Sequence, residues 1–173
     1  MTDGSDLHTT RAPWLQNFIT MYENLGGQNN DAPTTNNSPT NNAHQTDPQD
    51  FTPLLHVYHV DVEFIDPLHH LNGVSALVAY FQNMYTNVAS CQFVINHVIE
   101  SENEAAIYWT MTYSHKNLNG KQPIEVIGHS HLKQREGMVA YHRDYLDVGA
   151  MVYEHIPLLG RVITAIKNRA GKL

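Results

Sequence analysis

The sequence predicts a single α+β domain in which helices come first and a long antiparallel sheet follows. In the first half, apolar residues recur at three- and four-residue steps, the spacing of one helix face. From Cys91 onward they alternate instead, as they do in half-buried strands. The chain of 173 residues is long enough for one domain of ordinary size and too short for two. We therefore expect one domain over residues 1–173.

The first half predicts three helices separated by polar or short segments. Pro13 begins a helix over residues 13–25, and Gly26-Gly27 ends it. Residues 28–50 are rich in Asn, Thr and Pro and predict a flexible insertion, because almost nothing in them could enter a core. The next elements expected are a short helix over residues 52–58, a short strand over 62–65, a turn over 71–73 and an amphipathic helix over 74–87.

The second half predicts four long strands, over residues 91–100, 105–118, 124–134 and 138–146. Asn119-Gly120 joins the second to the third, and Asn-Gly is the strongest signal of a two-residue hairpin. Arg135-Glu136-Gly137 joins the third to the fourth as a three-residue loop. An apolar stripe predicts an amphipathic helix over about residues 157–172, added to a core over about residues 11–150.

Counting back from the two hairpins predicts which side chains share one face of the sheet. The first hairpin pairs Trp109 with Ser130, and the second pairs Ser130 with His142. A two-residue loop at Glu136-Gly137 would instead turn His129 and His131 to this face, since one residue of slip exchanges the faces. The predicted face is largely aromatic and apolar, as small-molecule pockets are, and consists of Trp109, Met111, Tyr113, Val126, Gly128, Ser130, Leu132, Ala140, His142 and Asp144.

Charge and composition exclude several classes of function. A net charge of −7 argues against nucleic acid as a partner, because phosphates are bound by clustered basic residues. Cys91 is the only cysteine, so an intramolecular disulfide is excluded, and its apolar neighbours predict a buried, inert thiol. His69 and His70 are adjacent and cannot share a strand face, and the predicted register turns the possible pair His129 and His131 outward, so we predict no metal site. We also expect no bound cofactor. No signal sequence or long apolar run is present, and we expect a cytoplasmic protein.

Three segments resemble a known family. They are residues 58–67, YHVDVEFIDP, followed by Gly73 and a helix; Asn103-Glu104-Ala105-Ala106; and residues 135–147, REGMVAYHRDYLD. Their order and spacing resemble the nuclear transport factor 2-like (NTF2-like) superfamily, in its ketosteroid-isomerase and SnoaL-like branch. The resemblance implies a strongly bent sheet around a conical pocket closed by helices, and a homodimer formed through the outer face of the sheet.

The resemblance also implies site residues. Asp66 falls where ketosteroid isomerases have their general base, and Asp144 where epoxide hydrolases and SnoaL-like proteins have a catalytic aspartate. His142 lies two residues before Asp144 on the same strand face, so the two are expected to form an acid–base pair. The alternatives are that Asp66 caps a turn, and that His142 and Asp144 are a hydrogen-bonded polar pair in the pocket wall that takes no part in catalysis. Phe18 and Ser130 stand where the isomerase has its tyrosine and aspartate donors, which argues against steroid-type isomerisation.

The expected function is cofactor-independent acid–base catalysis on a small apolar, lipid-like or polycyclic substrate. Asp66, His142 and Asp144 are the expected catalytic residues, and the expected substrate contacts are Phe18, Trp109, Met111, Tyr113, Val126 and Ser130. The alternative is a ligand-binding protein of the same fold without catalysis. In the last helix, four basic residues lie beside the apolar stripe and predict either complementation of the helix dipole or weak contact with a membrane surface; they are Arg161, Lys167, Arg169 and Lys172.

Deletion of residues 29–46 is expected to leave the melting temperature nearly unchanged, because these residues contain no side chains that could anchor to a core. Differential scanning calorimetry of the full and shortened chains measures the effect. A fall of more than about 8 °C, which corresponds to roughly 2–4 kcal/mol in a domain of this size, would show that the segment packs.

Overall fold

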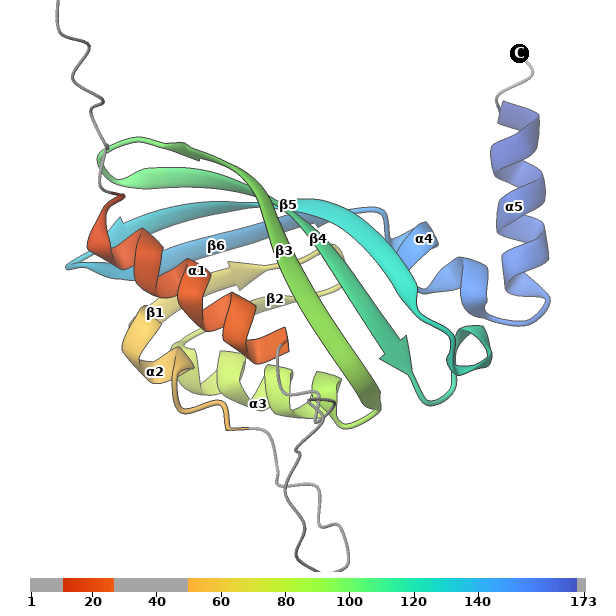
Figure 1. Ribbon diagram of the computed structural model, residues 1–173, viewed down its shortest axis with the longest axis horizontal. Helices are drawn as coiled ribbons and strands as arrows, with labels where there is room; N and C mark the ends of the chain where they lie inside the picture. The colour runs from red at the N-terminus through yellow and green to blue at the C-terminus, as the bar shows by residue number, and fades with distance from the viewer. Residues whose placement is uncertain (1–10, 27–49, 171–173) are drawn as a thin grey trace, which may run out of the picture.

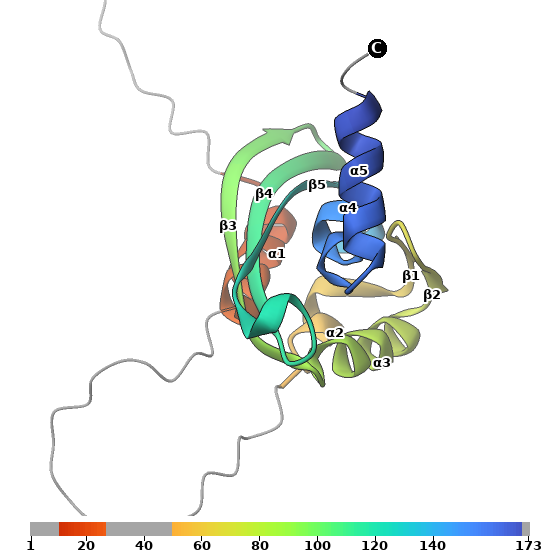
Figure 2. The same cartoon turned by 90° about the vertical axis from the view of Figure 1, so that its right-hand side faces the viewer.

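In the computed structural model, which describes residues 11–26 and 50–170, one curved six-stranded sheet wraps around the first helix (Figures 1 and 2). The strand order is β2-β1-β6-β5-β4-β3. The insertion predicted at residues 28–50 lies, except for Asp50, outside the described residues, as does Lys172. The α+β class predicted from the sequence is confirmed.

The first half contains the expected helices, together with more strand than the sequence predicts. The elements are α1 (Pro13–Gly26), α2 (Leu54–Val57), β1 (Tyr58–Ile65), β2 (His70–Asn72) and α3 (Val74–Tyr85). The turn predicted over residues 71–73 is wrong, because Leu71 pairs with Phe64 in an antiparallel β1–β2 hairpin. The chain reverses instead at Asp66, whose backbone N–H donates to the carbonyl of His69 at 3.0 Å.

The second half forms the four long strands at nearly the predicted positions. They are β3 (Val88–Glu100), β4 (Glu104–His115), β5 (Ile124–Arg135) and β6 (Met138–Leu146). Neighbours along the chain pair antiparallel, whereas β1 joins the edge of β6 in parallel. Beyond the sheet lie α4 (Val148–Met151), the 3₁₀ turn η2 (Tyr153–His155) and α5 (Leu159–Ala170).

The hairpin between β4 and β5 is longer than predicted. Residues 119–121 form a 3₁₀ turn, η1 (Asn119–Lys121), and the Asn119 side chain donates to the carbonyls of Gln122 and Pro123. Trp109 therefore pairs with Gly128 rather than with Ser130, a shift of two residues from the predicted register. A shift of two keeps every side chain on its predicted face, because strand side chains alternate with period two.

The hairpin between β5 and β6 combines a shorter turn with a bulge. Arg135 pairs with Met138, so the turn has two residues, Glu136 and Gly137, both with positive φ. The predicted three-residue loop is wrong, since this pair of conformations is typical of a tight type I′ turn. Further along, the register shifts between Lys133 and Gln134, which leaves Ala140 as an extra residue in β6.

The bulge decides which histidine lies inside the sheet. Beyond it, Leu132 pairs with His142 and Ser130 with Asp144, so His142 points to the concave side, where it is 0% exposed. His131 lies on the outer face and pairs with Glu104, 3.0 Å from its Nε2 atom. Of the predicted concave-face residues, Asp144 is partly buried, and so is Ala140 at the bulge, where Val139 is buried in its place. The others are all buried, and they are Trp109, Met111, Tyr113, Val126, Gly128, Ser130, Leu132 and His142.

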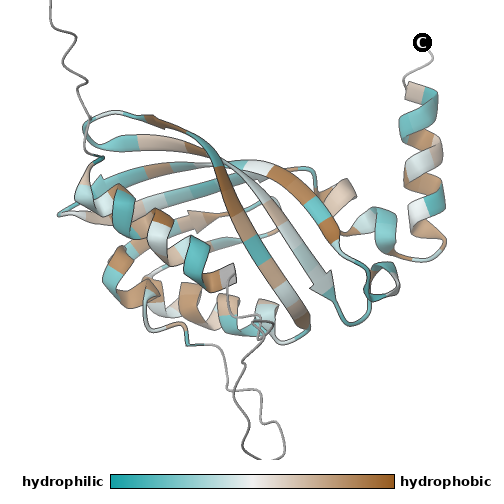
Figure 3. Cartoon of the chain, in the orientation of Figure 1, coloured by the Kyte–Doolittle hydropathy of each residue, from teal (hydrophilic) through white to brown (hydrophobic). Residues whose placement is uncertain are grey.

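The outer face of the sheet remains exposed in the described chain. Ile127 is 70% exposed and Val94 51% exposed, and colours for polar and apolar residues alternate along the strands in Figure 3. A homodimer through this face stays a prediction.

Helix α5 projects from the end of the sheet (Figure 1). Lys167 connects it to the body through Asp147, 2.7 Å from its Nζ atom, and through Glu154. Val162 and Ile166 of the apolar stripe are exposed, and no α5 residue lines the pocket described below. Weak contact of this helix with a membrane surface stays a prediction, and none of the helices in the described residues is long and apolar enough to span a membrane.

Substitution of Gly128 by Ala is expected to lower the free energy of unfolding by about 1–3 kcal/mol, as overpacking of a filled core does. A Cβ atom at this position would lie 2.3 Å from the Trp109 ring. Urea denaturation measures the loss, and Ile127→Ala on the exposed face is the control, expected within about 0.5 kcal/mol of the wild type. Equal stability of Gly128→Ala and the wild type would contradict the packing described here.

Candidate functional site

The concave side of the sheet, α1 and α3 enclose a cavity of about 70 Å³. Of the predicted site residues, Asp66, Trp109, Met111 and Asp144 line it. The other five are buried or nearly so in the wall behind it; they are Phe18, Tyr113, Val126, Ser130 and His142. The lining residues come from helices, strands and the turn between β1 and β2, and the two charged residues of the predicted set that line the pocket are carboxylates.

Asp144 lies in the wall with its two oxygens in different environments. Its Oδ1 atom accepts a hydrogen bond from the Ser130 hydroxyl at 2.5 Å and lies 2.8 Å from Nε2 of His142. Ser130 in turn accepts from the indole N–H of Trp109 at 2.9 Å. Among the described residues Oδ2 has no donor, so this oxygen is free to contact a molecule in the pocket.

His142 connects Asp144 to two buried tyrosines. Its Nδ1 atom lies 2.7 Å from the Tyr58 hydroxyl, which lies 3.0 Å from the Tyr22 hydroxyl. With Asp144 ionised, Nε2 donates, Nδ1 accepts from Tyr58, and Tyr58 accepts from Tyr22, so every bond in the chain is satisfied. Burial raises the pKa of both phenols well above its usual range, and both remain proton donors.

Asp66 has partners on both oxygens. Its Oδ1 atom accepts from the backbone N–H groups of Leu68 and His69, at 2.6 and 2.7 Å, and Oδ2 accepts from the Tyr80 hydroxyl at 2.5 Å. The turn-capping alternative therefore describes its hydrogen bonds, although the same carboxylate lines the cavity. Burial is the largest cause that raises the pKa of Tyr80. Its hydrogen bond to Asp66 and the negative charges of Asp66 and Asp144 raise this pKa further.

The sequence analysis missed three tyrosines of the site, Tyr22, Tyr58 and Tyr80. A signal for Tyr22 was available, because it lies one helical turn after Phe18, and their rings stack at 4.4 Å. Tyr58 and Tyr80 have no such signal, since their partners lie 84 and 14 residues away in the chain.

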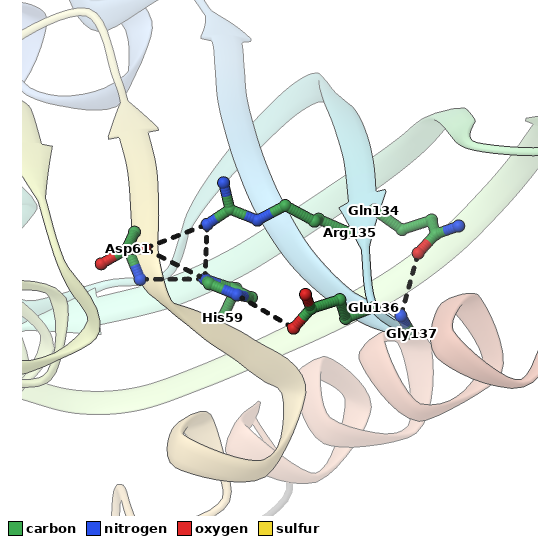
Figure 4. Close-up of polar contacts among 6 residues, drawn as sticks. All are labelled: His59, Asp61, Gln134, Arg135, Glu136 and Gly137. Atoms are coloured by element: carbon green, nitrogen blue, oxygen red, sulfur yellow. Dashed lines mark hydrogen bonds and ion pairs between the residues drawn. The ribbon is translucent and has the colours of Figure 1, made fainter.

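A further cluster of polar side chains lies at the β5–β6 turn. Figure 4 shows His59 beside the β5–β6 turn, where its Nδ1 atom accepts from Arg135 at 2.8 Å and from the Asp61 N–H at 3.0 Å. No group of three or more His, Cys, Asp or Glu residues in the described ranges could hold a metal ion. Cys91 is buried as predicted, and burial raises the pKa of its thiol to about 11.

Comparison with known families and proteins gives one match in sequence and many in structure. The family model of the SnoaL-like domain matches residues 44–142. No curated protein matches the sequence significantly.

Solved structures share the fold at low sequence identity. A protein described as a SnoaL-like polyketide cyclase from Jannaschia sp. CCS1 superposes with a TM-score of 0.61 at 12% identity, covering 82% of this chain and 93% of that one. One from Shewanella putrefaciens CN-32 gives 0.59 at 14% identity, covering 82% and 95%. A protein with a ketosteroid isomerase-like fold from Catenulispora acidiphila DSM 44928, in complex with trimethylamine, gives 0.54 at 13% identity, covering 60% and 78%. At these identities the similarity shows the fold alone, and the predicted NTF2-like architecture is confirmed.

Removal of the Tyr58 hydroxyl by Tyr58→Phe is expected to lower the free energy of unfolding by about 1–3 kcal/mol, because it leaves the Tyr22 hydroxyl and Nδ1 of His142 without a partner in the core. Urea denaturation measures the change. Tyr108→Phe, at a tyrosine that is 40% exposed on the outer face, is the matched control and is expected to be neutral. Equal stability of the two variants would show that the hydrogen-bonded chain contributes nothing.

Proposed function

Because the chain belongs to the SnoaL-like domain family, whose model matches residues 44–142, we propose that its pocket binds a small organic molecule and that Asp144 exchanges protons with it. The observation behind this proposal is the asymmetry of the Asp144 carboxylate. One oxygen is held by Ser130 and His142, and the other has no donor among the described residues and belongs to a group that lines the cavity. A base must be both positioned and accessible, and this carboxylate meets both requirements.

His142 acts in this proposal as a positioning residue. It is 0% exposed and does not line the cavity, so a ligand meets Asp144 first. Its imidazole fixes Oδ1 and connects it to Tyr58 and Tyr22, whose phenols remain protonated. The proton that Asp144 accepts is thus exchanged with the ligand or with water in the pocket.

Proton abstraction next to a carbonyl group is the reaction class that we favour. Two structural neighbours are described as polyketide cyclases, and polyketides contain C–H bonds beside carbonyl groups, which a positioned carboxylate can ionise. Asp66 is the second candidate for proton transfer, although donors occupy both of its oxygens.

Non-catalytic binding of the same ligand is the second candidate function. The hydrogen bonds of Asp66 favour this function. Donors on both oxygens satisfy the carboxylate as a turn cap, so Asp66 has no free oxygen that could act as a base.

Exchange of the α-protons of 2-indanone in D₂O, followed by NMR, tests the proposal. The wild type is expected to accelerate exchange above the buffer rate, and Asp144→Asn is expected to lose about 100-fold of that acceleration, the usual contribution of a general base. Asp61→Asn removes the same charge from a side chain that is 73% exposed outside the pocket, and it should retain the full rate.

Two outcomes would contradict proton transfer by Asp144. One is exchange at the buffer rate with the wild type. The other is equal acceleration by the wild type and Asp144→Asn, and either outcome leaves the binding function.

A further inference from the structure

The pocket wall combines aromatic rings with negative charge. Six aromatic side chains line it, and they are Tyr22, Phe64, Tyr80, Phe81, Phe93 and Trp109. The charged lining residues are Asp66 and Asp144, and the lining contains no Lys, Arg or His. His69 contacts Asp66 but does not itself line the cavity, and His142 lies behind Asp144. The described pocket therefore has two carboxylates and no lining cation to balance them.

Tyr80 marks the region where the two carboxylates act together. Its hydroxyl donates to Asp66, and its ring contacts those of Phe64 and Phe81, with centroids 5.7 Å away in both cases. The charges of Asp66 and Asp144 both raise the pKa of this phenol, in addition to burial and the hydrogen bond. A field that opposes a phenolate at this point favours a positive charge there.

Aromatic faces and carboxylates attract the same kind of ligand. The face of an aromatic ring is the negative end of its quadrupole, and it attracts quaternary and protonated amines. A carboxylate removed from water is stabilised by a partner of opposite charge. An anionic ligand would meet repulsion from both kinds of group, whereas a cation would be attracted by both.

We infer that the pocket recognises an organic cation, a substituted ammonium group attached to an apolar body, with the positive charge beside Tyr80 and between the two carboxylates. Attraction of this kind acts through the field and the ring faces, so the ammonium group does not need an N–H donor. Oδ2 of Asp144 then remains available for the proton transfer proposed above. The inference depends on that proposal only in taking this cavity as the ligand site.

The cavity has a volume of about 70 Å³ and is partly open, so a ligand can place its charged head group inside while its apolar body extends toward the opening.

Choline and 3,3-dimethylbutan-1-ol form the matched pair of probes, since they differ only in nitrogen against carbon and hence in charge. Titration followed by intrinsic tryptophan fluorescence and by ligand NMR gives both dissociation constants. The wild type is expected to bind choline about tenfold more tightly than the neutral alcohol, the ratio that a desolvated cation–π contact supplies. Asp66→Asn and Asp144→Asn should each reduce this ratio at least about threefold, and Asp61→Asn outside the pocket should leave it unchanged.

The outcomes separate this inference from the proposed function. Equal binding of choline and the alcohol by the wild type, or an unchanged ratio in Asp144→Asn, would overturn the inference, even if 2-indanone exchange depends on Asp144. A tenfold preference for choline together with exchange at the buffer rate would support it and contradict only the catalysis. Asp144→Asn keeps the test decisive where Asp66→Asn fails to fold, because Asp144 caps no turn.

Discussion

The buried imidazole of His142 is the constraint on which the rest of the site depends. A polar ring that is 0% exposed is stable only if both nitrogens have partners, because an unpaired polar group in a core costs free energy. Its partners come from different parts of the chain: Tyr58 at the start of β1, and Asp144 on β6. Tyr22 adds α1 to the same chain of hydrogen bonds. The hydrogen bonds of this one ring therefore help to fix two features of the fold. They are the parallel pairing of β1 with β6 and the position of α1 on the concave side of the sheet.

The same arrangement gives the pocket its two unlike carboxylates. Asp66 lies where the chain leaves β1, and backbone donors of the turn hold it, so its position follows from local structure. Asp144 lies in a strand and depends on side chains of β4, β5 and β6 for its orientation. Backbone donors of the turn thus occupy Oδ1 of Asp66 and the Tyr80 hydroxyl occupies Oδ2, whereas Asp144 has partners on Oδ1 alone among the described residues.

The sequence predicts the fold class, the four long strands and the face on which His142 lies, because alternation and helical spacing depend on neighbouring residues. It does not predict β2, whose pairing with β1 depends on contacts with another strand, or the η1 turn, where Asn119 side-chain bonds override the usual Asn-Gly hairpin. Both errors leave the concave face intact. The hydrogen bonds of Tyr58 with His142 and of Tyr80 with Asp66 could not be predicted from the sequence either, because these residues become neighbours only in the folded domain. Asp66 and Asp144 were found by resemblance, and the structure places both at the cavity.

The β5–β6 hairpin has a consequence for how such a domain can vary in length. The two turn residues and the bulge residue Ala140 add up to three unpaired residues, the same number as in the three-residue loop that the sequence predicts. The side chains of β6 beyond the bulge therefore point to the predicted faces of the sheet. Gain or loss of one residue here would change that parity and exchange interior and exterior along the rest of β6. Insertions and deletions are therefore tolerated in this hairpin only in pairs, or when a second bulge compensates the first. The placement of His142 and Asp144 on the concave side therefore depends on the length of this short surface turn as much as on the identity of the two residues.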